Sequence, residues 1–177
     1  MNRTFWITAL ISFTNSLSFT ILIPILYLYG RQFNLTDFQT SLLFSIYSVA
    51  QFFATPVIGK LSDRVGRKPL LIISLAGTVI ANFMAGTAST AGILFFARFL
   101  DGITGGNASV AQAVVSDIIP PQDRAKAFGI YSAITFGLAF ILGPVISLLA
   151  QTFSLGAGFL VASGCALLSL LITVFFL

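Results

Sequence analysis

The stretch that decides the fold is GKLSDRVGRKP at residues 59–69, which places four cations, one acid and two glycines between two long apolar runs. Each flanking run is long enough for a helix that crosses a bilayer, which needs about 20 apolar residues. A short basic loop between two such helices lies on the cytoplasmic side of the membrane under the positive-inside rule. This placement orients every other segment, because consecutive spans alternate in direction.

The composition excludes a water-soluble fold. Of the 177 residues, 57% are hydrophobic and only 8% are charged, so polar groups could not cover a water-exposed surface. The net charge of +4 does not indicate nucleic acid as a partner, since four of the nine cations lie in the loop at 59–69. The sequence has no histidine, and its one cysteine, Cys165, lies in an apolar run. We expect an all-α membrane protein that is no enzyme and holds no metal or cofactor.

Six apolar runs are long enough to form membrane spans. They predict one six-helix domain over 1–177, with helices at about 5–29, 38–58, 70–88, 91–116, 127–150 and 155–177. Seven of the nine cations lie before the first run, in the loop at 59–69, or between the fourth and fifth runs. This distribution predicts that both termini lie in the cytoplasm, and we expect the plasma (inner) membrane as the location.

The run at 91–116 contains two opposite charges, Arg98 and Asp101, which share one face of a helix because they are three residues apart. At about 1.5 Å per residue, Arg98 lies about 10 Å inside the span. Ionisable residues at such depth are costly and are usually functional. Burial favours the neutral form of Asp101 whereas Arg98 favours the charged form, so Asp101 is a candidate proton carrier. The alternative is a structural ion pair that only holds helices together.

Other polar residues within the runs are candidates for a cavity wall. Asn15, Asn107 and Gln112 lie in apolar runs, where polar side chains bond to neighbouring helices or line a cavity. Asp117 directly follows the fourth run. Gly143 and Pro144 predict a kink in the run at 127–150.

The charged stretch also reads G-x-L-S-D-R-x-G-R-K, and it resembles the signature between helices 2 and 3 of the major facilitator superfamily of transporters. The resemblance implies a gate, in which the acid meets the N-terminus of a helix in the opposite half of the molecule. The arginines would pair with acids at the inner end of helix 4, where Asp117 is the preferred partner for Arg64 or Arg67. The residues carried over to this gate are Gly59, Asp63, Arg64, Gly66, Arg67 and Asp117.

Two further motifs are similar to those of the tetracycline and multidrug/proton antiporters. The stretch at 98–102 resembles the pattern R-x-x-Q-G, with Asp101 at the glutamine position. The stretch at 139–147 resembles G-x-x-x-G-P-x-x-G, with Ala139 and Ser147 at two glycine positions. Helix 1 of these antiporters often carries a carboxylate nine residues before a proline. Asn15 occupies that position here, which implies a substrate-binding group in place of a proton carrier.

The resemblance implies two inverted three-helix repeats that form one half of a transporter. It further implies proton-coupled efflux of an amphiphilic small molecule such as a drug. Family transporters are about twice this length, so we expect as partners the substrate, protons, the lipid bilayer and a second six-helix half. That half would be a second copy or a separate chain, and in a C2 homodimer Asp63 would face the region of Lys126 and Phe128 in the other copy. The alternative is a non-transporting half, either a truncated product or an accessory membrane subunit.

Overall fold

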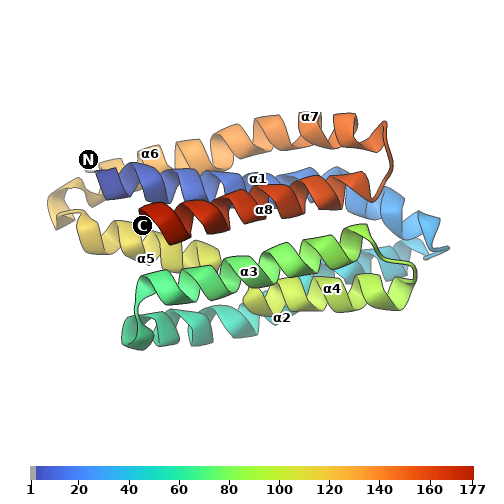
Figure 1. The fold of residues 1–177 in the computed structure, drawn as a ribbon, viewed down its shortest axis with the longest axis horizontal. Coiled ribbons are helices and arrows are strands. Elements are labelled where there is room, and N and C mark those ends of the chain that lie inside the picture. The colour runs from blue at the N-terminus through green and yellow to red at the C-terminus, as the bar shows by residue number, and fades with distance from the viewer. Residues whose placement is uncertain (1–2) are drawn as a thin grey trace.

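The computed structural model describes residues 3–177, which form a flattened bundle of helices. Figure 1 shows the long helices lying side by side, with the start of α1 and the end of α8 at the same end of the bundle. The elements are α1 (Arg3–Gln32), α2 (Asp37–Val65), α3 (Arg67–Gly86), α4 (Ala91–Thr104), α5 (Asn107–Ile118), the 3-10 helix η1 (Pro121–Asp123), α6 (Arg124–Ser132), the π-helix η2 (Ala133–Leu138), α7 (Ala139–Gln151) and α8 (Ala157–Phe176).

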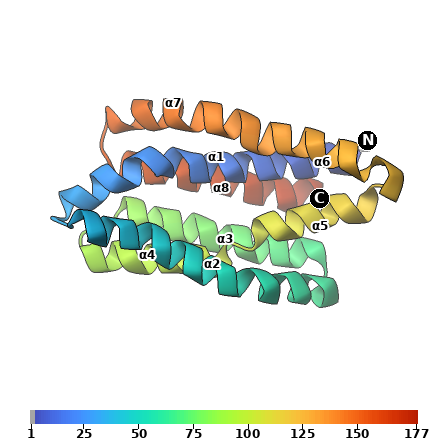
Figure 2. The same ribbon diagram turned by 180° about the vertical axis from the view of Figure 1, so that it is seen from behind.

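Five helical stretches within residues 3–177 are long and apolar enough to cross a membrane: α1, α2, α3, the run Pro121–Gln151 and α8. The continuous helix predicted at 91–116 is wrong, because α4 ends at Thr104 and α5 begins at Asn107. The physical reason is the pair Gly105 and Gly106, since glycine is a poor helix former. Figure 2 shows α5 extending along the bundle beyond the end of α4.

The charged stretch at 59–69 is mostly helical, which differs from the loop predicted there. The helix predicted to end at residue 58 continues to Val65, and Gly66 alone separates α2 from α3. Gly59 therefore lies inside α2. Gly66 has a backbone φ angle of 109°, which residues with a Cβ atom rarely adopt. Pro69 lies in the first turn of α3, where its missing N–H costs nothing.

The helices form two groups that meet between α3 and α8. In one group α1 packs against α7 and α8, and in the other α4 packs against α2 and α3. Figure 1 shows this order, from α7 through α1, α8 and α3 to α2 and α4. The most apolar part of α1 is 61% buried, whereas that of α2 is only 11% buried. We infer that α1 is the central helix of its group and that α2 presents most of its surface outward.

Gly143 allows α7 to lie close to α1. A Cβ added to this residue would lie 2.2 Å from Thr20 Oγ1. Thr20 could not move aside without loss, because its hydroxyl donates to the carbonyl of Ala139 at 2.9 Å. Small residues of this kind let membrane helices pack closely. Pro144 lies inside α7, which continues past it to Gln151.

This contact predicts that Gly143→Ala destabilises the chain. The added methyl group overpacks the α1–α7 contact, at a cost of about 1–3 kcal/mol in the free energy of unfolding. The control is Gly164→Ala in α8, where a Cβ would have open space, and it should be neutral or stabilising by up to about 1 kcal/mol. Unfolding of both variants in one detergent measures the difference. Equal stability of the two variants would contradict the proposed packing role.

Candidate functional site

Arg98 and Asp101 form a buried ion pair on α4. Arg98 Nη1 lies 2.8 Å from Asp101 Oδ2, and the two residues are only 2% and 6% exposed. The structure thus brings together the two residues that the sequence singled out. Arg98 Nε has no hydrogen-bond partner among residues 3–177. Opposite charges inside a membrane protein are tolerated when they neutralise each other in this way.

Tyr47 covers the guanidinium group of Arg98 from α2. The Arg98 Cζ atom lies 4.4 Å from the centre of the Tyr47 ring, a geometry in which the ring attracts the cation. Gly102 makes this approach possible, because a Cβ there would lie 2.5 Å from the backbone oxygen of Tyr47. Sequence reasoning missed Tyr47, since one tyrosine in an apolar run forms no pattern.

Asn15 of α1 and Asn107 of α5 form a reciprocal pair of amides. Asn15 Nδ2 donates to Asn107 Oδ1 at 3.1 Å, and Asn107 Nδ2 donates to Asn15 Oδ1 at 3.2 Å. Asn107 Nδ2 also lies 3.4 Å from Thr78 Oγ1 on α3, and Thr78 lines the same small cavity as Asp101. Thr78, which sequence reasoning also missed, thus connects the amide pair with the ion pair.

The break between α4 and α5 is stabilised by a side chain from α2. Gln51 Nε2 donates to the carbonyl oxygen of Gly105 at 2.9 Å. A broken helix inside a membrane leaves backbone groups without their usual partners, and these need bonds from neighbouring helices. Gln51 provides one such bond, and the break allows α5 to begin at Asn107, where its amide meets Asn15.

A surface cavity of about 230 Å³ lies beside the amide pair. Its lining combines amides and hydroxyls with aromatic rings: Asn15, Ser16, Phe19, Thr20, Tyr47, Gln51, Asn107, Ala108, Phe136 and Phe140. Phe136 belongs to the π-helix η2, and π-helical segments occur frequently at functional sites. Gln112 lines a smaller adjoining cavity together with Asn15 and Asn107. The three residues predicted for a cavity wall therefore lie in one region.

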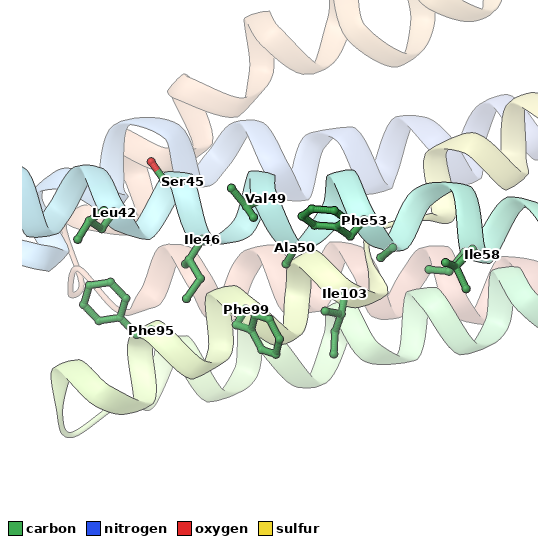
Figure 3. Close-up of a pocket in the computed structure, with 12 residues that line it drawn as sticks. Leu42, Ser45, Ile46, Val49, Ala50, Phe53, Ile58, Phe95, Phe99 and Ile103 are labelled. Carbon is green, nitrogen blue, oxygen red and sulfur yellow. The ribbon is translucent and has the colours of Figure 1, made fainter.

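A larger cavity of about 760 Å³ is an apolar groove between α2 and α4. Figure 3 shows Phe95, Phe99 and Ile103 of α4 facing side chains of α2 across it. Its lining is apolar apart from Ser45, so the groove offers few polar groups to orient a ligand. The smaller cavity at Asn15 is the better candidate for a substrate site. Within residues 3–177, no three acidic or cysteine side chains are grouped so that they could hold a metal ion.

A cluster of charged residues lies where α2 ends and α3 begins, and it includes the expected contact with Asp117. Arg67 Nε lies 3.0 Å from Asp117 Oδ2, and Arg67 Nη1 contacts Asp63 and donates to Ser62 Oγ. Of the two arginines considered, Arg67 thus contacts Asp117, while the Arg64 side chain is exposed. The cluster joins α2, α3 and α5. Because the Asp117 side chain is 55% exposed, the pair adds little to stability, and it can separate readily.

A family model described as the Major Facilitator Superfamily matches residues 8–177. The match covers nearly the whole chain and agrees with the helical bundle and with the buried polar residues described above. The chain belongs to the Major Facilitator Superfamily and is an integral membrane protein.

Relatives in this family are longer than the chain. The tetracycline resistance protein, class E, of Escherichia coli is 33% identical over 181 residues, which cover 100% of this chain and 44% of that protein. The class C protein of Escherichia coli is 41% identical over 133 residues, 75% of this chain and 33% of that protein. The crystal structure of the human organic anion transporter MFSD10 (TETRAN) superposes with a TM-score of 0.81 at 23% identity, covering 98% of this chain and 47% of that one. The chain thus spans about half the length of the relatives it matches.

The amide pair predicts energetic coupling between Asn15 and Asn107. Each single change, Asn15→Leu or Asn107→Leu, leaves a partly or fully buried amide without its partner and should cost about 1–3 kcal/mol. The double variant should cost less than the sum, by about 1 kcal/mol or more, because no amide is then left unpaired. Unfolding of the four proteins in one detergent measures this coupling.

The control for this cycle pairs Asn15→Leu with Gln122→Leu. Gln122 is exposed in η1 and does not line the cavities at Asn15, so these two effects should add. Additive effects in the Asn15 and Asn107 cycle as well would show that the amide pair contributes no coupling.

Proposed function

We propose that the chain is a transmembrane transporter component that exports an amphiphilic small molecule, such as a drug, in exchange for protons. The observation that supports this function best is the buried pair of Arg98 and Asp101, which connects through Thr78 to residues that line the cavity at Asn15. A carboxylate in such a position can gain or lose a proton as the site changes its access to either side of the membrane. Two relatives in the family are named as tetracycline resistance proteins, which also favours a drug as substrate.

In this proposal Asp101 carries the proton and Arg98 is its electrostatic partner. A proton on Asp101 removes the negative charge that neutralises Arg98, and the guanidinium group then keeps the Tyr47 ring as a favourable neighbour. The free energy of the buried site therefore depends on the protonation state. Such a difference can bias a transporter between two conformations.

The substrate would bind in the cavity beside the amide pair. Asn15, Asn107 and Gln112 would supply hydrogen bonds, while Phe136 and Phe140 would supply apolar contact. A lining of this mixed kind fits a ligand with both polar and apolar surface. The cavity lies near the ion pair, so occupation by substrate and protonation of Asp101 can influence each other.

The topology we propose treats α4 and α5 as one broken span. Together with the five long stretches this gives six spans over 1–177, which we propose form two inverted three-helix repeats. Both termini would lie in the cytoplasm, and the protein would reside in the plasma (inner) membrane. The cytoplasmic gate would consist of Asp63, Arg64, Gly66, Arg67 and Asp117, with Gly59 inside the end of α2. Gly143 and Pro144 would kink the fifth span.

Transport requires a second six-helix half, and we propose that a second copy or a separate chain supplies it. Halves of this fold have parallel topology, so two copies related by a C2 axis along the membrane normal can enclose a central cavity. Asp63 is exposed at the end of α2. It would face the region of Lys126 and Phe128 in the other half, where the start of a helix favours negative charge.

Replacing the proton carrier tests the transport mechanism. Asp101→Asn should lower proton-driven tetracycline flux at least about tenfold, because an amide cannot exchange a proton with water in this pH range. The matched control is Asp37→Asn, since Asp37 is exposed and pairs with Arg31 at 2.7 Å near the start of α2. Flux is measured in proteoliposomes that contain the chain, with an imposed pH gradient. Unchanged flux in Asp101→Asn would contradict the role of Asp101.

The association of two copies is tested by copurification. We expect a detergent-purified particle with a protein mass of twice 18.9 kDa, and capture of one tagged copy by another. Asp63→Asn should weaken this capture, whereas Asp37→Asn, a change at an exposed acid at the opposite end of α2, should not. Capture that is unaltered in Asp63→Asn would contradict the proposed contact. A particle with the mass of one chain, together with an absence of tetracycline flux, would favour the alternative, which is a non-transporting half or an accessory subunit.

A further inference from the structure

A second, much smaller polar cavity lies against Asp101. Its volume is about 20 Å³, and a cavity needs about 10–15 Å³ to hold one water molecule. The side chains around it come from five helices, with the backbone of the α4–α5 break at one edge: Asn15, Ser18, Phe19, Leu22, Tyr47, Thr78, Asn82, Asp101, Gly105 and Asn107. The cavity is therefore large enough for a single water and has several polar neighbours.

Asn82 on α3 presents an unpaired acceptor at this cavity. The residue is 1% exposed, and its Nδ2 donates to the backbone carbonyl of Thr78 at 3.0 Å. Its Oδ1 has no hydrogen-bond partner within the part of the chain that the structure describes. A buried carbonyl oxygen without a donor is costly, and such groups usually bond to an ordered water.

Two of the neighbouring donors are already engaged. The Ser18 hydroxyl donates to the carbonyl of Ala162 at 2.8 Å, and Asn107 Nδ2 is directed toward Asn15 and Thr78. Asp101 has further acceptor capacity, because an ionised carboxylate accepts about four hydrogen bonds. The cavity thus has two acceptors and needs a ligand that donates to both of them.

The charges around the cavity favour water over a cation as that ligand. Arg98 lies 2.8 Å from Asp101, so its positive charge already neutralises the carboxylate and would repel a second cation. The other titratable group at the cavity is Tyr47, whose ring covers Arg98. A neutral molecule with two donors meets the requirements of the site.

We propose that this cavity is a binding site for one water molecule, which donates to Asn82 Oδ1 and to the Asp101 carboxylate. Asn82 is then a positioning residue that acts on Asp101 through the water. Asn15 and Asn107 line both this cavity and the 230 Å³ cavity, so the two cavities adjoin. A proton arriving from the larger cavity binds the water, which passes one of its protons to Asp101 and is left neutral. This relay rests on the proposed function, whereas the water site does not.

The water site is tested by nuclear magnetic resonance of the ¹⁵N-labelled chain in deuterated detergent. The Asn82 side-chain amide protons, assigned through their loss in Asn82→Leu, should show a cross-peak to a long-lived water. Ser18→Val adds bulk to the wall of the cavity and should remove this cross-peak. Ser16→Val, a matched change on the same helix at the larger cavity, should leave it. No cross-peak in the wild type, or one that persists in Ser18→Val, would overturn the site.

The relay is tested separately by transport in proteoliposomes. Asn82→Leu should slow gradient-driven tetracycline flux about tenfold, because the water leaves and Asp101 loses the hydrogen bond that the water donates to it. Exchange of labelled for unlabelled tetracycline without a gradient should be unchanged. Asn82→Ser keeps an acceptor and should restore most of the gradient-driven flux. Normal gradient-driven flux in Asn82→Leu would overturn the relay. A wild-type chain that exchanges no tetracycline would instead contradict the proposed function, and the resonance experiment would still decide the water site.

Discussion

The buried pair of Arg98 and Asp101 is the interaction on which the rest of the structure depends. Two opposite charges at this depth are stable only when they neutralise each other and have polar neighbours, because lipid hydrocarbon supplies no hydrogen-bonding groups. Tyr47 covers the cation, and Thr78 lines the same small cavity as the carboxylate, so α2 and α3 both lie close to α4. Gly102 permits the approach of α2 by having no side chain. The packing of three helices is thus organised around one pair of charges.

The break in the fourth apolar run extends this polar region toward the cavity. Gly105 and Gly106 interrupt the helix, and α5 begins at Asn107, whose amide pairs with Asn15 on the central helix α1. Gln51 stabilises the interruption by bonding the carbonyl of Gly105. A continuous helix would place these groups differently and would need no bond from Gln51. The break therefore connects the charges on α4 with the amide wall of the cavity through a short chain of hydrogen bonds.

The two larger cavities differ in chemistry because of the helices that line them. The groove between α2 and α4 is lined by the outward faces of two helices and is almost entirely apolar. The cavity at Asn15 is lined by α1, α2, α5, η2 and α7, and it combines amides with phenylalanine rings. The position of an amphiphilic substrate thus follows from where the inward-facing polar residues meet.

Local patterns in the sequence determined the membrane location, the apolar runs and the closeness of Arg98 and Asp101, because hydropathy and a spacing of three residues act within one helix. The tertiary structure alone decided the contacts between distant segments. In the tertiary structure Asn15 pairs with Asn107, 92 residues away, and Arg67, not Arg64, contacts Asp117. These choices depend on how each helix is rotated and how closely it packs against its neighbours. Rotation and packing are set by many side chains together, so no spacing along the chain could predict them.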